Sequence, residues 1–369
     1  MKKVAIITIT TGQNYGNKLQ NYALQKSLQD LHFDVYTLKH KRTSDLFINK
    51  SISVAKTIIK IIIKRPYNRI KKNRIKCFKE FGNRSIIFSD YTLSFNNYPK
   101  GLTNKYDYFI AGSDQVWNAG FQVINEELKN YLLQFAKPEQ RVAYAASFGT
   151  DKIAPGYEHY FKEELPKFKA ISVREESGVK LVEECGAKAT VVLDPTMLLN
   201  SDQWKEIARR PDYVEKAPFV VTYFLGGRDA ELTAYINRIA NGRKIYNLEI
   251  ESASENTIDS IEVFATAPDE FVWLIANADC VLTDSFHATV FSILFHKPFC
   301  VFERKAINES YKMGGRIDTL LGKFHLERFR DSDRSFSVVP EKYEIDEIER
   351  VLDVERKKSL DFLISALSD

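Results

Sequence analysis

Residues 278–302, ADCVLTDSFHATVFSILFHKPFCVF, alternate short apolar runs with polar loops. We expect strands at 278–282 and 298–302 and a helix at 288–295, because short apolar runs bounded by turn residues favour buried strands. A helix between two buried strands is typical of a parallel α/β sheet. His287 then lies in the first turn of a helix that starts at the carboxyl end of a strand.

The position of His287 suggests chemistry on an anion. Open α/β sheets bind ligands at the carboxyl ends of their strands, and the unpaired N–H groups of a helix start attract negative charge. A titratable imidazole at such a place suggests acid–base catalysis on an anionic substrate. The alternative is a histidine that only forms hydrogen bonds at the helix start.

The same alternation runs through the 369 residues, a length that suits two domains. Further strands are expected at 4–10, 33–38, 106–111, 141–148, 170–174, 189–193, 219–225 and 244–249. A charged connector at 202–216 suggests a domain boundary. We therefore predict an α/β protein with two Rossmann-like domains that face a central cleft. They would cover residues 1–205 and 206–340, and a helix within 341–369 would pack back across the junction.

The composition limits the function classes. The chain is 44% hydrophobic and 28% charged, as in an ordinary soluble protein. Its four cysteines form no CxxC pair, and no metal-ligand spacing appears among its cysteines and six histidines, so we expect reduced thiols, a cytoplasmic protein, and neither a metal nor another cofactor. The first apolar run, at 4–9, is too short for an export signal. No apolar stretch approaches the ~18 residues that cross a bilayer.

A basic helical insertion is predicted at residues 39–84. This segment holds 15 lysines and arginines but only two acids, Asp45 and Glu80. Apolar residues recur within it at helical spacing, at Ile48, Ile52, Ala55, Ile59 and Ile62. Such a pattern favours an anionic membrane surface as a partner, which would place the protein on the inner face of the cell membrane. Nucleic acid, which we do not expect, and a solvated helix folded onto its own domain are the alternatives.

Two polar loops in the first half suit a sugar. The loop TGQNYGN at 11–17 offers Asn14 and Asn17, whose amides suit hydroxyl-rich ligands or a phosphate; the alternative is a glycine turn with Asn17 as the helix cap. The loop at 112–118 offers Asp114, Gln115 and Trp117. Asp114 is alternatively a helix cap.

Several basic residues also follow predicted strands. Arg174 needs an anion or a carboxylate where it follows a buried strand, and an ion pair with Glu175, Glu176 or another acid is its alternative role. Gly226-Gly227-Arg228 forms either a helix-start anion site or a plain turn. Arg304 and Lys305 end the strand after the His287 helix, where they point into the cleft or lie on the surface.

Together these segments resemble the polysaccharide pyruvyl transferases. The resemblance is carried by the Asn-Tyr-Gly-Asn loop (14–17), AGSDQVW (111–117), YAASFG (144–149), SVREESGVKLVEECG (172–186), VLDPTMLL (192–199) and TDSFHATVFSILFHKPF (283–299). It implies two Rossmann-like domains in the arrangement called GT-B. It also implies transfer of a pyruvyl group from phosphoenolpyruvate to two hydroxyls of a glycan sugar, which forms a cyclic ketal during cell-surface polysaccharide synthesis.

The resemblance assigns roles residue by residue. The family's histidine corresponds to His287, its SVRE arginine to Arg174, and its basic residue after the following strand to Lys305. We expect a donor site and an acceptor site for a glycan or lipid-linked oligosaccharide. The donor site would comprise Arg174, Ser285, Thr289, Arg304, Lys305 and Arg228, and the acceptor site Asn14, Asn17, Asp114, Gln115 and Trp117. Many members have Arg-Leu before the histidine where this chain has Ser285-Phe286, so Arg304, Arg316 or Arg228 would have to replace that arginine.

Two other functions stay open at this point. One is a GT-B glycosyltransferase that uses a nucleotide-sugar, with Glu249 or Glu251 holding the ribose. The other is a non-catalytic protein that binds a membrane or nucleic acid through residues 39–84.

Overall fold

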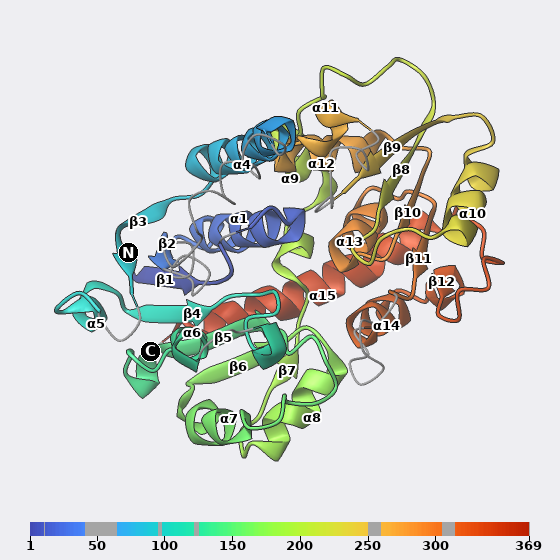
Figure 1. Ribbon diagram of the computed structural model, residues 1–369. Helices are drawn as coiled ribbons and strands as arrows, with labels where there is room; N and C mark the ends of the chain where they lie inside the picture. The colour runs from blue at the N-terminus through green and yellow to red at the C-terminus, as the bar shows by residue number, and fades with distance from the viewer. Residues whose placement is uncertain are drawn as a thin grey trace.

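The fold consists of two parallel sheets, each flanked by helices (Figure 1), which confirms the predicted α/β class. The computed structural model describes residues 1–10, 12–40, 65–94, 98–121, 125–249, 260–304 and 314–368. Every strand pair in both sheets is parallel. Such sheets need helices on both faces, which explains why most of their strands are apolar runs.

The first sheet has seven strands in the order β3-β2-β1-β4-β5-β6-β7. The strands are β1 (Lys3–Ile7), β2 (Asp34–His40), β3 (Phe88–Leu93), β4 (Tyr108–Ala111), β5 (Arg141–Ala146), β6 (Ala170–Val173) and β7 (Thr190–Val191). The helices of this half are α1 (Tyr15–Asp30), α4 (Arg65–Ser85), α5 (Leu102–Lys105), α6 (Asn125–Tyr131), α7 (Glu158–Glu164), α8 (Glu176–Glu184) and α9 (Ser201–Ile207).

The second sheet has five strands in the order β12-β11-β10-β8-β9. The strands are β8 (Phe219–Tyr223), β9 (Lys244–Leu248), β10 (Cys280–Thr283), β11 (Phe299–Phe302) and β12 (Arg330–Asp331). The helices are α10 (Ala230–Ala240), α11 (Ile261–Phe264), α12 (Pro268–Asn277), α13 (Phe286–Leu294), α14 (Gly315–Lys323) and α15 (Ile345–Ala366). The strand–helix–strand unit predicted from residues 278–302 is therefore β10-α13-β11.

Strand order reverses at one place in each sheet, between β1 and β4 in the first and between β8 and β10 in the second. Ligands of open α/β sheets bind in the crevice at such a switch point, outside the carboxyl ends of the strands. The loops that follow these four strands are those that the sequence marked as polar. They form the surroundings of the candidate site.

One apolar core spans the junction between the two halves. Tyr15 at the start of α1 stacks on Phe271 of α12, with ring centres 4.4 Å apart and planes 17° from parallel. Arg74 of α4 is fully buried and donates to the carbonyls of Gln13 at 2.9 Å and of Phe264. One side chain of α4 thus contacts both halves.

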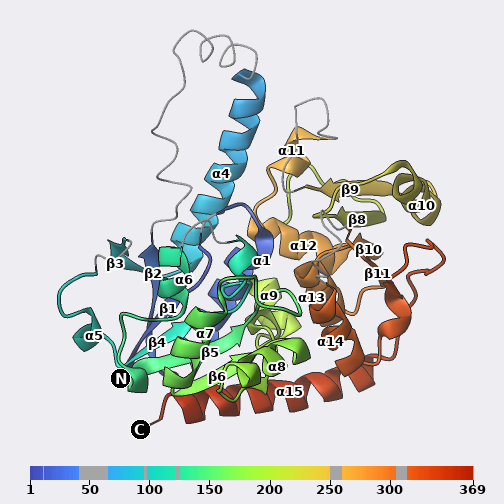
Figure 2. The same cartoon turned by 60° about the horizontal axis from the view of Figure 1, so that its bottom comes forward.

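The basic segment at 39–84 is only partly described, because residues 41–64, with the predicted apolar stripe, lie outside the described ranges. Its second part is α4, which packs beside α1 and extends away from the sheets at its N-terminal end (Figure 2). Phe78 and Phe81 of α4 are buried in the junction core. This part of the segment is a helix folded onto its own protein.

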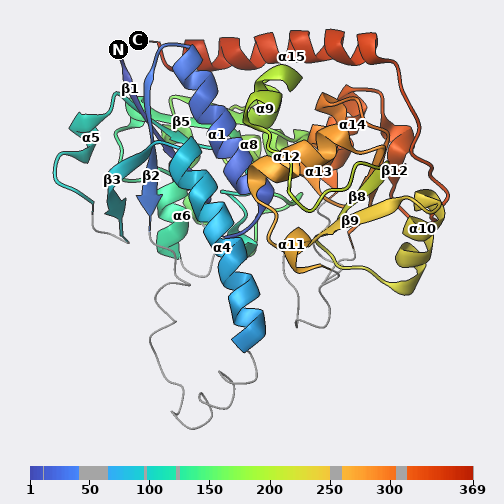
Figure 3. The same ribbon diagram turned by 90° about the horizontal axis from the view of Figure 1, so that it is seen from above.

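Helix α15 runs along both halves and ends beside the N-terminus (Figure 3). Near its start, Ile348 and Leu352 belong to the junction core. Near its end, Leu363 and Ala366 pack against the first sheet. The boundaries at residues 205 and 340 stay predictions.

Strand β3 was not predicted from the sequence. Its residues FSDYTL include the exposed Asp90, and it lies at the edge of the sheet, where one side of a strand faces solvent. The four cysteines are free thiols, as expected. None of the described helices combines the length and hydrophobicity needed to cross a membrane.

Candidate active site at the domain junction

His287 is the second residue of α13, in the first helical turn, as predicted. Ser285 caps this helix, and its hydroxyl accepts from the N–H of Ala288 at 3.5 Å. The preceding carboxylate, Asp284, accepts from the N–H groups of Leu225 at 2.6 Å and Gly226 at 2.8 Å. Asp284 therefore joins the loops after β8 and β10, and this fixes the start of α13.

The imidazole of His287 crosses to the first half of the chain. Its Nε2 lies 3.7 Å from Oδ2 of Asp194, beyond hydrogen-bond distance, and forms no hydrogen bond with a described residue. On its other side the ring touches the start of α1: a Cβ on Gly16 would lie only 2.0 Å from Nδ1 of His287. Glycine is thus required at position 16 for the two helix starts to meet.

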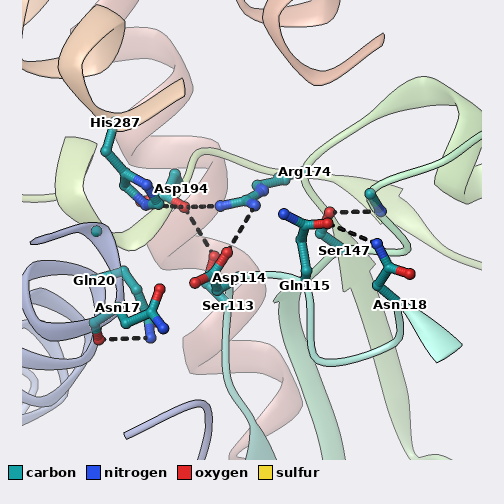
Figure 4. Close-up of polar contacts among 12 residues, drawn as sticks. Asn17, Gln20, Ser113, Asp114, Gln115, Asn118, Ser147, Arg174, Asp194 and His287 are labelled. Atoms are coloured by element: carbon teal, nitrogen blue, oxygen red, sulfur yellow. Dashed lines mark hydrogen bonds and ion pairs between the residues drawn. The ribbon is translucent and has the colours of Figure 1, made fainter. Parts of the chain in front are cut away.

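Asp194 is the centre of this polar cluster (Figure 4). It follows β7, and its Oδ2 accepts from Ser113 at 2.8 Å and from Arg174 at 2.7 Å, while its Oδ1 accepts from the hydroxyl of Thr196 at 2.6 Å. Burial alone would raise the pKa of Asp194. The charges of His287 and Arg174 and the Thr196 hydroxyl outweigh burial and hold this pKa well below its usual range.

Arg174 lies at the end of β6, and its charge is already matched. Its guanidinium is fully buried and contacts Asp194 at 2.7 Å and Asp114 at 3.3 Å. Burial lowers the pKa of Arg174, but these carboxylates and Glu175 raise it above its ordinary value. The alternative of an internal ion pair is therefore present in the structure. Its Nε has no hydrogen-bond partner but lies 3.9 Å from Oε2 of Glu175, within ion-pair distance.

Arg316, in the first turn of α14, is also buried, yet it forms no ion pair or hydrogen bond with any described residue. Burial, followed by the charge of Arg174, lowers the pKa of Arg316 to about 9, although the charges of Glu175 and Asp114, which lie beyond ion-pair distance, partly oppose this shift. Its guanidinium lies 6.0 Å from the ring centre of Phe286, and that of Arg174 lies 4.5 Å from the same centre. The ring of His287 is 5.3 Å from Phe286. A buried cation with no carboxylate of a described residue within ion-pair distance is costly, so Arg316 marks a place that suits an anion.

The other basic residues of the predicted donor site are engaged. Arg304 lies 3.6 Å from Asp284, and Arg228 lies 3.5 Å from Glu249. Of the three possible substitutes for the missing family arginine, Arg316 alone has no acidic partner among the described residues. Lys305 lies outside the described residues. The hydroxyl of Thr289 is buried and donates to the Ser285 carbonyl at 3.0 Å. This hydrogen bond lies within the helix, so the hydroxyl hydrogen of Thr289 is already engaged.

The predicted acceptor residues gather at the switch point of the first sheet. Asn14 caps α1 by accepting from the N–H of Gly16 at 2.9 Å, so it fills the role that was considered for Asn17. Asn17 is half-buried in the first turn. Asp114 is nearly buried and adopts a left-handed conformation, with φ of 71°, rather than capping a helix. Gln115 accepts from Asn118 at 2.7 Å.

Trp117 is not at the surface of the site. It is 1% exposed, packs against Phe148 and Phe161, and donates from Nε1 to the Tyr131 carbonyl at 3.2 Å. A sugar that stacks on an aromatic ring needs an exposed face, which this ring lacks. Trp117 supports the loop from the core.

Some residues of the cluster were missed as site residues. Asp194, Ser113 and Thr196 lie beside the predicted ones, and Gly16 makes room for His287. Asp194 directly follows an apolar run in a VLDP segment, the same pattern of a polar residue after a strand that marked Arg174. Within the described ranges, no group of three or more histidines, cysteines, aspartates or glutamates could hold a metal ion.

Comparisons with known proteins bear on the fold and on the family of the chain. The solved UDP-GlcNAc 2-epimerase from Neisseria meningitidis, bound to UDP-GlcNAc, is 10% identical with a TM-score of 0.52, covering 100% of this chain and 99% of its own. A UDP-N-acetylglucosamine 2-epimerase from Rickettsia bellii is 12% identical, with a TM-score of 0.47 and coverage of 100% and 97%. At 10% identity the likeness to the Neisseria meningitidis protein shows the fold alone, which is the predicted GT-B arrangement.

No curated protein sequence gave a significant match. The sequence pattern described as "Polysaccharide pyruvyl transferase" matches residues 14–305. That range includes both helix starts that meet at His287, together with the Arg174–Asp194 pair. The chain therefore belongs to the polysaccharide pyruvyl transferase family.

Proposed function

We propose that the protein transfers a pyruvyl group from phosphoenolpyruvate to two hydroxyls of a glycan sugar, forming a cyclic ketal during cell-surface polysaccharide synthesis. The observation that carries this proposal is Arg316, a buried guanidinium without an acidic partner among the described residues, on the ring that also contacts His287. An anionic substrate beside an imidazole is what the reaction needs.

The chemistry assigns a proton transfer to His287. Phosphoenolpyruvate is protonated at its methylene carbon, which leaves an oxocarbenium-like centre at C2. One sugar hydroxyl adds to C2, phosphate leaves, and the second hydroxyl closes the ketal. The two sugar hydroxyls lose two protons in total. One of them replaces the proton that His287 gives to the methyl group, and the other leaves with phosphate. A positioned histidine is the usual general acid for such a step.

The charged residues around His287 take separate roles in this proposal. Arg316 and the start of α13 would hold the carboxylate or phosphate of the donor. Asp194 would orient His287 and stabilise its protonated form, as a carboxylate does for a catalytic imidazole. Because Arg174 forms ion pairs with Asp194, Asp114 and Glu175, we assign it mainly to positioning Asp194.

The acceptor sugar would lie at the switch point of the first sheet. Asn17 and Gln115 offer amide groups there, and Asp114 lies beside Arg174. The basic segment at 39–84 would bring the protein to an anionic membrane surface, where a lipid-linked acceptor is made. The acceptor is then a growing glycan rather than a free sugar.

A nucleotide-sugar glycosyltransferase is less well supported. The solved epimerase named above is bound to UDP-GlcNAc, but its likeness concerns the fold. Of the two candidate ribose ligands, Glu249 accepts from Asn247 at 2.8 Å and lies near Arg228, and Glu251 lies outside the described residues. Glu249 is thus already engaged by neighbouring side chains.

The deciding experiment measures phosphate release from phosphoenolpyruvate by the purified full chain, with and without a glycan acceptor. Release that depends on the acceptor is expected. The parallel measurement is thermal unfolding with phosphoenolpyruvate and with uridine diphosphate. Protection by uridine diphosphate alone, without phosphate release, would replace the proposal by a glycosyltransferase, and no response to either ligand would favour a non-catalytic binding protein.

A further inference from the structure

Three lysines that form no ion pair within the described part of the chain surround a cavity between α1 and α4. This cavity of about 340 Å³ opens at the carboxyl ends of β1 and β2. Twelve residues line it, among them Lys18, Lys39 and Lys79, and none of the twelve is an aspartate or glutamate. None of the three lysines forms an ion pair with a described residue. A cavity of this size suits a small ligand, and its charge suits an anion.

Lys18 is the most deeply placed of these lysines. It is 8% exposed, and its ammonium donates to the Thr10 carbonyl. Burial lowers the pKa of Lys18 to about 8. Lys39 and Lys79 are exposed residues on the wall of the same cavity, and Lys39 lies over the ring of Phe88, 6.0 Å from its centre. An ammonium that is buried without a carboxylate gains stability when an anion binds beside it.

The cavity lies close to the catalytic histidine. Lys18 lies two residues after Gly16 in the chain, and Gly16 touches His287. Residues two apart on a helix point to nearly opposite sides, so the cavity and His287 flank the first turn of α1, about 10 Å apart across the helix. Asn17 lies between them, and its side chain has no hydrogen-bond partner among the described residues.

We propose that this α1–α4 cavity binds the phosphate groups of the acceptor, which is therefore a sugar carried on a diphosphate. The assignment to the acceptor rests on the proposed function. The phosphates would contact Lys18, Lys39 and Lys79, and the sugar would extend past Asn17 toward His287. Two sources share this chemistry, a lipid-linked diphosphate sugar and a nucleoside diphosphate sugar.

The test uses inorganic pyrophosphate as the probe, with calorimetric titration of the full chain in phosphate-free buffer. Lys18→Met should weaken binding about tenfold or more, since a hydrogen bond to a charged group is lost. Lys18→Arg should keep most of the affinity. Lys72→Met is the matched control, because Lys72 is exposed on α4 and does not line the cavity. Melting curves of each variant verify folding.

Two results would overturn the inference. One is pyrophosphate binding by a folded Lys18→Met variant as tight as that of the wild type. The other is loss of pyrophosphate binding in Arg316→Met but not in Lys18→Met, which would put the probe in the donor site. Competition by farnesyl diphosphate and by uridine diphosphate then identifies the source of the phosphates. Tighter competition by farnesyl diphosphate indicates a lipid carrier, and tighter competition by uridine diphosphate indicates a nucleotide carrier. In both cases Lys18→Met must weaken the binding of the competitor.

Failure of this inference can be told apart from failure of the proposed function. If phosphoenolpyruvate is turned over with the same KM for phosphate-free and diphosphate-linked forms of one glycan, the proposed function stands and the inference is rejected. If pyrophosphate binding depends on Lys18 in a protein that never releases phosphate from phosphoenolpyruvate, the proposed function is rejected and the cavity remains a phosphate site.

Discussion

Arg174 and Arg316 lie by the same phenylalanine ring, yet their surroundings differ in kind. Arg174, from the first half of the chain, has Asp194 and Asp114 within ion-pair distance. Arg316, from the second half, has no acidic partner among the described residues, and burial lowers its pKa to about 9. The two arginines are alike in residue type and burial, and they differ in whether a carboxylate lies within ion-pair distance. This difference is the reason for proposing Arg316, rather than Arg174, as the main ligand-binding arginine.

The largest expected effect belongs to the imidazole between the two arginines. His287→Ala should lower kcat for phosphate release by about 10²–10⁴-fold, the usual contribution of a positioned acid. Binding of phosphoenolpyruvate should change far less, because Arg316 and the start of α13 still hold the anion. Steady-state kinetics with a melting curve check this, and near-normal turnover by a stable variant would falsify the proposed role.

Replacing the paired arginine should damage the fold. Arg174→Met leaves Asp194 and Asp114 buried without their cation, and breaking a buried pair in this way costs about 3–5 kcal/mol of unfolding free energy. Chemical denaturation measures the loss. If Arg174→Met kept wild-type stability and lost only affinity for the donor, Arg174 would bind the ligand as Arg316 is proposed to do. The proposed difference between the two arginines would then be wrong.

Replacing the unpaired arginine should do the opposite. Arg316→Met removes a buried charge that has no partner, so the ligand-free protein should be as stable as the wild type or more so. Its affinity for phosphoenolpyruvate should fall about 10–100-fold, as when a hydrogen bond between charged groups is lost. Thermal unfolding with and without the ligand shows both effects. A ligand-free variant that melts well below the wild type would show that Arg316 has a structural partner.

The smallest effect concerns pH and Lys18, a third buried cation. Because the pKa of Lys18 is about 8 when folded and near 10.5 in an unfolded chain, its charge disfavours folding below pH 8. That penalty is lost as pH rises from 8 to 10.5. Lys18→Met should therefore gain stability over the wild type at pH 7, and the gain should shrink by pH 10. A gain that does not vary with pH would mean that folding does not lower the pKa of Lys18.

The fold was largely accessible from the sequence, because buried parallel strands are continuous apolar runs and their helices start at capping residues such as Ser285. The strand that was missed, β3, lies at an edge and is polar. The position of His287 followed from local pattern alone. By contrast, the site depends on contacts between residues that are far apart in the sequence. Asp194 and His287 are separated by 93 positions, and Gly16 and His287 by 271. The absence of a partner for Arg316 leaves no trace in its own sequence neighbourhood.

The contact between Gly16 and His287 also bears on when substrates can enter the site. In the proposed reaction, substrates must reach an imidazole whose side chain is only 8% exposed, so we expect the two halves to separate for exchange. Separation would pull His287 off Gly16 and away from Asp194 in one movement. The proposed acid would then be complete only in the closed state, and a donor that has not been enclosed would not be protonated.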